Sequence, residues 1–228
     1  EGVAGRMGAR LMAIVAEGAR GRVYLAPTSE HDATARQAQP CWKPETRLPD
    51  DPRNFWTLAY GLATYGDLFT PRQLVALTTF SDLVQEAIAR CHADALAAGM
   101  ADDGLGLDAG GNGATAYAQA VGVYLAFAVN RSADFWSNLC VWANQPKNEL
   151  VAHLFGRQAI PMAWDFAEAT PFSSSGGNFL KNLEYVRKGV EFFPFQPLNG
   201  CALQADAQSQ TISAAKVVST DPPYYDNI

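Results

Sequence analysis

Residues 70–99 read TPRQLVALTTFSDLVQEAIARCHADALAAG and decide how the middle of the chain folds. Thr70 is a preferred N-cap residue, and Pro71 suits the first position of a helix, where its missing N–H is not needed. Apolar residues then recur at near-helical spacing as far as about Ala98, and Gly99 is a typical stop signal. We predict a long amphipathic helix whose apolar stripe packs in the core.

A second long helix is predicted over residues 114–143, which are rich in Ala, Val, Tyr and Phe. Within it, Arg131 and Asp134 are three residues apart, a spacing that favours an exposed ion pair over two buried polar anchors. Residues 104–109 fit the Gly-x-Gly-x-x-Ala pattern of dinucleotide-binding proteins. That pattern must follow a strand, however, and here it follows a helix, so we interpret residues 101–113 as a loop.

The flanking segments predict smaller elements. In residues 10–26, two short apolar runs separated by a glycine-containing turn predict a β-hairpin. Residues 29–39 predict a short helix capped by Ser29, and the four prolines between residues 40 and 52 predict an extended connector. Residues 179–192 predict a further helix, which follows a loop rich in Ser and Gly.

The composition is that of a globular chain. Apolar residues make up 48% of its 228 residues. No apolar run approaches the ~20 residues that span a bilayer, and no secretory leader is recognisable. The four cysteines and three histidines are scattered, so we expect no metal site and a reducing, cytoplasmic location. The net charge of −6 argues weakly against a dedicated nucleic-acid-binding domain.

The final residues carry the most specific chemistry of the chain. Residues 217–228 read VVSTDPPYYDNI, in which a β-branched run leads into Asp221-Pro222-Pro223-Tyr224. A second apolar run, residues 201–207, ends in Asp206 and one further alanine. We predict two consecutive strands that bring both carboxylates to the carboxyl edge of a sheet, where open α/β sheets bind ligands.

At a sheet edge, this tetrapeptide suits methyl transfer to an exocyclic amine. The Asp221 carboxylate and the Pro222 carbonyl can each accept a hydrogen bond from an NH2 group, and the fixed φ of proline aims the carbonyl outward. Two acceptors favour a pyramidal nitrogen whose lone pair points towards an electrophilic methyl group, so catalysis rests on positioning and desolvation. Tyr224 offers a flat ring on which a base flipped out of a duplex can stack.

The tetrapeptide resembles the catalytic motif of the amino-methyltransferases, which transfer a methyl group from S-adenosylmethionine to adenine N6 or cytosine N4. Nearly the whole chain is similar to the large zinc-ribbon-containing adenine-specific DNA methyltransferases, notably in residues 5–11, 67–74, 155–162 and 219–227. The resemblance implies S-adenosylmethionine as cofactor, DNA as partner and Asp206 as the acid that contacts the adenine of the cofactor. In such proteins the glycine loop for the cofactor and the zinc ribbon precede this segment. We therefore expect an internal segment of a longer protein, inactive by itself.

The expected fold class is α/β and mainly helical. It comprises a β-hairpin and connector (1–52), a large helical insertion (53–193) and two strands of an incomplete Rossmann-like methyltransferase sheet (194–228). The expected activity is DNA adenine-N6 methylation, with restriction, phage defence or regulation as its role and further subunits as partners. Two alternatives stay open: an acceptor in cytosine, RNA or a protein amide, and a non-catalytic helical module for target recognition or docking.

Overall fold

The computed structural model describes the chain except for residues 146–147, 157–158, 194–202 and 222–228. The chain divides into two compact units, Glu1–Phe192 and Phe193–Ile228, and each is described by itself. The described residues contain helices and two small antiparallel sheets, so the chain mixes α and β structure. Within these ranges, every helix is too short or too polar to cross a membrane.

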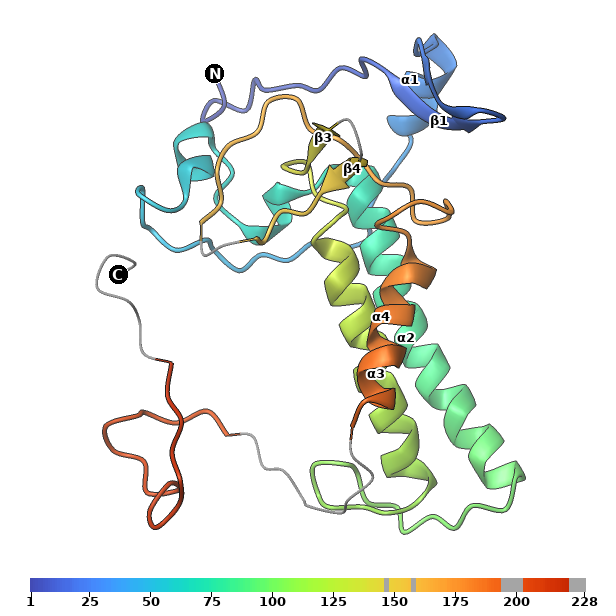
Figure 1. Ribbon diagram of the computed structural model, residues 1–228, viewed down its shortest axis with the longest axis vertical. Coiled ribbons are helices and arrows are strands. Elements are labelled where there is room, and N and C mark those ends of the chain that lie inside the picture. The colour runs from blue at the N-terminus through green and yellow to red at the C-terminus, as the bar shows by residue number, and fades with distance from the viewer. Residues whose placement is uncertain (146–147, 157–158, 194–202, 222–228) are drawn as a thin grey trace. The chain divides into compact units, whose positions relative to one another are not determined.

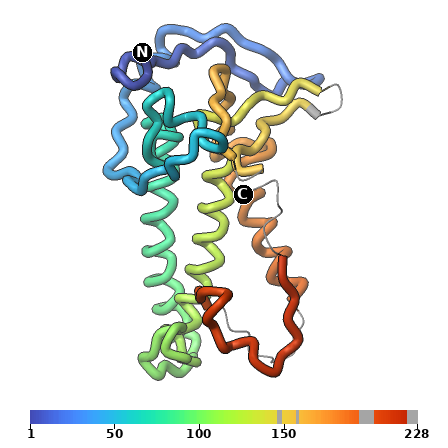
Figure 2. Tube along the Cα trace, turned by 90° about the vertical axis from the view of Figure 1, so that its left-hand side faces the viewer, coloured from blue at the N-terminus to red at the C-terminus, as the bar shows by residue number. Residues whose placement is uncertain are grey.

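Three helices form the body of the first unit. α2 (Pro71–Ala97) packs along α3 (Ala114–Ala133), and α4 (Phe179–Glu191) packs on α3, as Figures 1 and 2 show. The predicted capping of α2 is confirmed: the Thr70 hydroxyl accepts from the Gln73 amide, and the Gln73 side chain accepts from the Thr70 amide at 2.8 Å. Reciprocal capping of this kind satisfies amides that a helix leaves without partners.

The second long helix ends ten residues earlier than predicted. α3 stops at Ala133, and β3 (Val141–Gln145) then pairs antiparallel with β4 (Asn148–Ala152). The chain leaves the helix because residues 137 and 138 form hydrogen bonds to a distant segment. The Ser137 hydroxyl donates to the Leu68 carbonyl at 2.8 Å, and the Asn138 amide donates to the same carbonyl. Tertiary bonds therefore replace the helical ones that local apolar content favours.

The N-terminal hairpin and the short helix are confirmed. β1 (Ile14–Gly18) pairs antiparallel with β2 (Gly21–Leu25), and α1 (Ser29–Ala35) follows. The cap of α1 is Thr28 instead of Ser29, because the Thr28 side chain accepts from the amide of His31.

A compact apolar cluster lies at one end of the helices. It gathers buried residues from the proline-rich segment, from the 3₁₀ helix Tyr65–Leu68 and from the segments around β3 and β4, and the partly buried Leu58 of the 3₁₀ helix Trp56–Tyr60 packs against it. Its buried members are Leu48, Leu68, Leu139, Cys140, Leu154 and Ile160. This cluster fixes the residues that follow α3, including those of the candidate site.

The described part of the second unit lacks the strands expected near both carboxylates. Its described residues, Phe193 and 203–221, form turns, bends and irregular structure. The Asp206 carboxylate accepts from the Gln208 amide at 2.9 Å, while its carbonyl accepts from the amides of Ser209 and Gln210. Such local bonds to an Asp side chain stabilise a turn at the expense of a strand. The prediction of strands over 201–207 and 217–221 is therefore wrong for the described part of these segments.

Candidate functional site

The predicted catalytic residues fall at the edge of the described chain. Asp221 is exposed and is the last described residue, whereas Pro222, Pro223 and Tyr224 lie outside the described residues. Asp206, the predicted cofactor contact, is exposed at the start of its turn. The turn takes the place of the strand end that was expected to carry Asp206 to a sheet edge.

In the first unit, a row of cationic and aromatic side chains crosses the end of α3. The Arg131 guanidinium lies 4.5 Å from the ring centre of Tyr185 on α4 and 5.9 Å from that of Phe135. The Phe135 ring is in turn 6.0 Å from the imidazole of His153, which directly follows β4. We call these four residues the stacked row.

The stacked row overturns the expected pairing of Arg131 with Asp134. Asp134 bonds other groups: its carboxylate accepts from the Phe155 amide at 2.6 Å and lies 3.1 Å from Nδ1 of His153. Arg131 stacks on rings and has no acidic partner among the residues that the structure describes. Arg131 is exposed, and its guanidinium N–H groups make no hydrogen bond to the described residues, so they retain donor capacity.

A buried polar network holds α3 and α4 in the register that this row requires. Asn182 of α4 is almost completely buried and donates from Nδ2 to the Ser132 hydroxyl at 3.0 Å. Ser132 donates to the carbonyl of Ala128 at 2.8 Å. Because Ser132 follows Arg131 directly, and Asn182 lies three residues before Tyr185, this network places the cation beside the ring.

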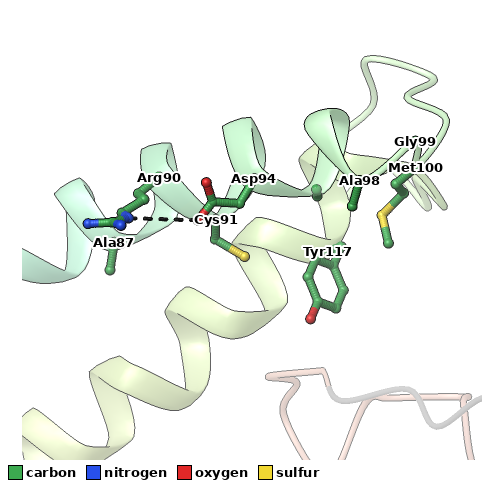
Figure 3. A pocket seen from close by; sticks show the side chains of 9 residues that line it. Ala87, Arg90, Cys91, Asp94, Ala98, Gly99, Met100 and Tyr117 are labelled. Carbon is green, nitrogen blue, oxygen red and sulfur yellow. Dashed lines mark ion pairs between the residues drawn. The ribbon is translucent and has the colours of Figure 1, made fainter.

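A groove lined by the C-terminal part of α2 and the first turn of α3 is a second candidate. It has a volume of about 760 Å³, and Figure 3 shows Cys91 of α2 and Tyr117 of α3 among its lining side chains. Its charged residues, Arg90 and Asp94, pair with each other at 3.7 Å on the exposed surface of α2. The lining is otherwise small or apolar, so the groove lacks convergent polar groups that would orient a ligand.

Beside this groove, Asp102 clamps the loop between α2 and α3. Its carboxylate accepts from the Thr115 hydroxyl at 2.8 Å and from the Thr115 amide at 3.0 Å, and it lies 3.1 Å from Nε2 of His92. The residue types are those of a nucleophile, base and acid. The same ring nitrogen of His92 faces both partners, however, so the relay through two ring nitrogens that a catalytic triad needs is not formed. We interpret the cluster as a structural clamp.

The clamp predicts a pH-dependent contribution to stability. The hydrogen bond from His92, followed by those from Thr115, lowers the pKa of Asp102 far below its ordinary value of about 3.9. A carboxyl group whose pKa is lowered by folding stabilises the fold above its unfolded pKa and loses that contribution as the pH falls towards its folded pKa. Asp102→Asn is therefore expected to lower the melting temperature at pH 7, and the difference from the wild type is expected to shrink below about pH 4.

Asp108→Asn is the matched control, because it removes the same charge from the same loop. Asp108 has no hydrogen bond or ion pair within the described part of the chain. Thermal melts of the three proteins from pH 7 to pH 3, followed by circular dichroism, provide the measurement. Equal behaviour of the two variants would show that Asp102 does not act as a clamp.

No group of three or more metal-ligating side chains occurs in the stretches that the structure describes. These features define a mixed α and β protein in which a three-helix body carries a surface row of stacked cationic and aromatic side chains. Comparison with models of protein families, with curated proteins and with solved structures found no significant match to this chain.

Sequence reasoning singled out Arg131 but assigned it the wrong partner. Tyr185 and His153 were missed, because they belong to other elements and only the packing of α4 and β4 against α3 brings them to Arg131. The one local signal was an Arg in an otherwise apolar helical segment.

Proposed function

We propose that this chain is a segment of an S-adenosylmethionine-dependent DNA methyltransferase that acts on adenine N6. The observation that carries the proposal is the tetrapeptide Asp221-Pro222-Pro223-Tyr224, which combines two hydrogen-bond acceptors, a rigid backbone and an aromatic ring. The Rossmann-like sheet that would support it, the cytoplasmic location and a role in restriction or phage defence belong to the same proposal.

In this proposal, the residues of the chain position the acceptor amine. The Asp221 carboxylate accepts a hydrogen bond from the N6 amine, and the Pro222 carbonyl accepts the second hydrogen, which turns the nitrogen lone pair towards the methyl donor. The Tyr224 ring stacks on the flipped base and excludes water from one face. No strong general base is needed for this step, because positioning and desolvation provide the catalysis.

S-adenosylmethionine supplies the methyl group when it is bound, and Asp206 is the described residue that we assign to it. The exposed Asp206 carboxylate accepts one amide hydrogen bond, from Gln208 to Oδ1. A carboxylate has about four acceptor sites, so it retains capacity for an amine or hydroxyl of the cofactor. Its acceptor oxygens suit the amine and hydroxyl donors of the cofactor in chemical type.

The test is methyl transfer by the longer protein to which we assign this segment. Asp221→Ala is expected to lower the rate of adenine methylation by at least about 100-fold, because loss of positioning at the reacting atom costs that much. Mass spectrometry of nucleosides from digested DNA measures N6-methyladenine and separates it from N4-methylcytosine.

Asp108→Ala serves as the control, since this exposed loop residue is expected to leave methylation unchanged. Retained activity of Asp221→Ala would refute the catalytic assignment. Methylation of cytosine, RNA or a protein amide in place of adenine would refute the choice of acceptor.

A second candidate function is a non-catalytic module for target recognition or docking. The three-helix body favours it, because α2, α3 and α4 form most of the regular structure in the described residues. Measurements on the wild type and on Asp221→Ala separate the two candidates. If the chain is a non-catalytic module, both proteins bind the target equally well, and neither transfers a methyl group.

A further inference from the structure

We propose that the stacked row, together with Lys181 of α4, binds a single strand of DNA. The inference adds a binding surface in the first unit to the methyl-transfer chemistry assigned to the end of the chain. The choice of DNA over other nucleic acids rests on the proposed function, whereas the surface itself is argued from its geometry and charge.

The aromatic side chains at the two ends of the stacked row are exposed. Tyr185 is 60% exposed although the Arg131 guanidinium lies 4.5 Å from its ring centre, so much of the residue remains open to a partner. The side chain of His153 is 52% exposed at the other end of the row. Nucleobases stack on aromatic rings and on guanidinium planes with little regard to sequence, which suits an unpaired strand.

Cationic side chains of α3 and α4 accompany these rings. Lys181 and Tyr185 are spaced at i and i+4 on α4, so the lysine lies beside the ring on one face of the helix. Lys188, one turn further on, is paired with Glu184 at 3.7 Å and is not counted among these cations. Lys181 and Arg131 are exposed and have no acidic partner in the described ranges of the chain. Asp134, the nearest acid in the sequence to Arg131, is engaged by His153 and by the Phe155 amide. The row therefore presents cations to a phosphate backbone.

Packing and a buried hydrogen bond hold the stacked row in place. Arg131 is held against two rings, and the α3–α4 register beneath it is fixed by the buried hydrogen bond between Asn182 and Ser132. A stacked guanidinium loses less conformational freedom on binding than a solvated one, which lowers the entropic cost of a contact. The carboxylates of an acidic protein segment would use the cations but not the exposed rings, whereas a nucleotide strand carries both phosphates and bases, and this favours the strand.

The experiment measures binding of the whole chain to a fluorescein-labelled 16-nucleotide DNA strand by fluorescence anisotropy, at salt concentrations from 50 to 200 mM. Arg131→Ala and Tyr185→Leu are each expected to weaken binding by about 10-fold, in the range found for lost base stacking. Tyr185→Phe keeps the ring and is expected to bind like the wild type. Lys181→Gln is expected to reduce the slope of log K against log salt by about 0.7, the value for one phosphate contact on a single strand.

Arg187→Gln is the matched control on the same helix. Arg187 already pairs with Glu184 at 2.7 Å and with Glu191, so its loss is expected to change binding by less than 2-fold. Circular dichroism confirms that each variant is folded, and the exposed positions of Arg131 and Tyr185 make unfolding unexpected.

Three outcomes would overturn the inference: absence of binding by the wild type, equal binding by Tyr185→Leu, or tighter binding of poly-glutamate or of an RNA strand of equal length. The assay requires neither cofactor nor methyl transfer. Its failure is therefore distinct from retained methylation by Asp221→Ala, which would refute the proposed function instead.

Discussion

Replacing Trp136 by Ala is expected to lower the free energy of unfolding by about 3–5 kcal/mol, the range for removal of a buried aromatic side chain. Trp136 is only 1% exposed, and its ring centre lies 5.6 Å from that of Phe80 on α2. Its indole N–H donates to the Gly177 carbonyl at 2.7 Å, immediately before the Asn178 cap of α4. The substitution removes packing against α2 and a bond that fixes the start of α4.

Urea denaturation followed by circular dichroism measures this effect. Trp136→Phe is expected to fall between the wild type and Trp136→Ala, because it keeps a ring but leaves the buried Gly177 carbonyl unpaired, at a cost of about 1–3 kcal/mol. Trp164→Ala is the control: Trp164 is 62% exposed, and its substitution is expected to cost less than about 1 kcal/mol. If Trp136→Ala and Trp164→Ala lowered the free energy of unfolding by the same amount, the central position of Trp136 would be contradicted.

A leucine in place of Gly122 is expected to destabilise the α2–α3 pair by about 3 kcal/mol or more, at the upper end of overpacking effects. Gly122 is buried in the middle of α3, where a Cβ atom would lie 2.4 Å from Cδ1 and 2.5 Å from Cγ1 of Ile88 on α2. The Ile88 side chain occupies the space that a side chain at position 122 would need.

Gly189→Leu is the matched control on α4. A Cβ atom there meets nothing within 4 Å, so the helix propensity of leucine is expected to raise the free energy of unfolding, by up to about 1 kcal/mol. The double variant Gly122→Leu with Ile88→Ala should recover part of the loss, since the smaller residue makes room for the larger one. A double-mutant cycle that shows no coupling energy between positions 122 and 88 would refute the contact between these two positions.

The helices were predictable where local signals agree with the tertiary structure. Thr70 and Pro71 mark the start of α2, and the structure shows the capping hydrogen bonds that these residue types predict. The β1–β2 hairpin follows from two short apolar runs and a glycine turn. Such signals act within a few residues, so they can be read without knowledge of the rest of the chain.

The end of α3 was not predictable in this way. Residues 134–143 continue the apolar character of the helix, yet Trp136 and Ser137 bond the distant carbonyls of Gly177 and Leu68. The prediction of a strand ending near Asp206 was wrong for the opposite reason. There a local side-chain bond to the Gln208 amide favours a turn, and no neighbouring strand is described with which the segment could pair.

The amino-acid sequence by itself determined the helices of the body, the first hairpin and the chemical character of the terminal tetrapeptide, because each depends on residues close together in the chain. Only the tertiary structure decided the partner of Arg131. Local spacing offers Asp134, but packing supplies the ring of Tyr185 from α4 and engages Asp134 with His153. The physical reason is that these contacts join different helices: Arg131 lies over the Tyr185 ring, and Asn182 bonds Ser132. Residues so far apart in the chain cannot be paired from their spacing in the sequence.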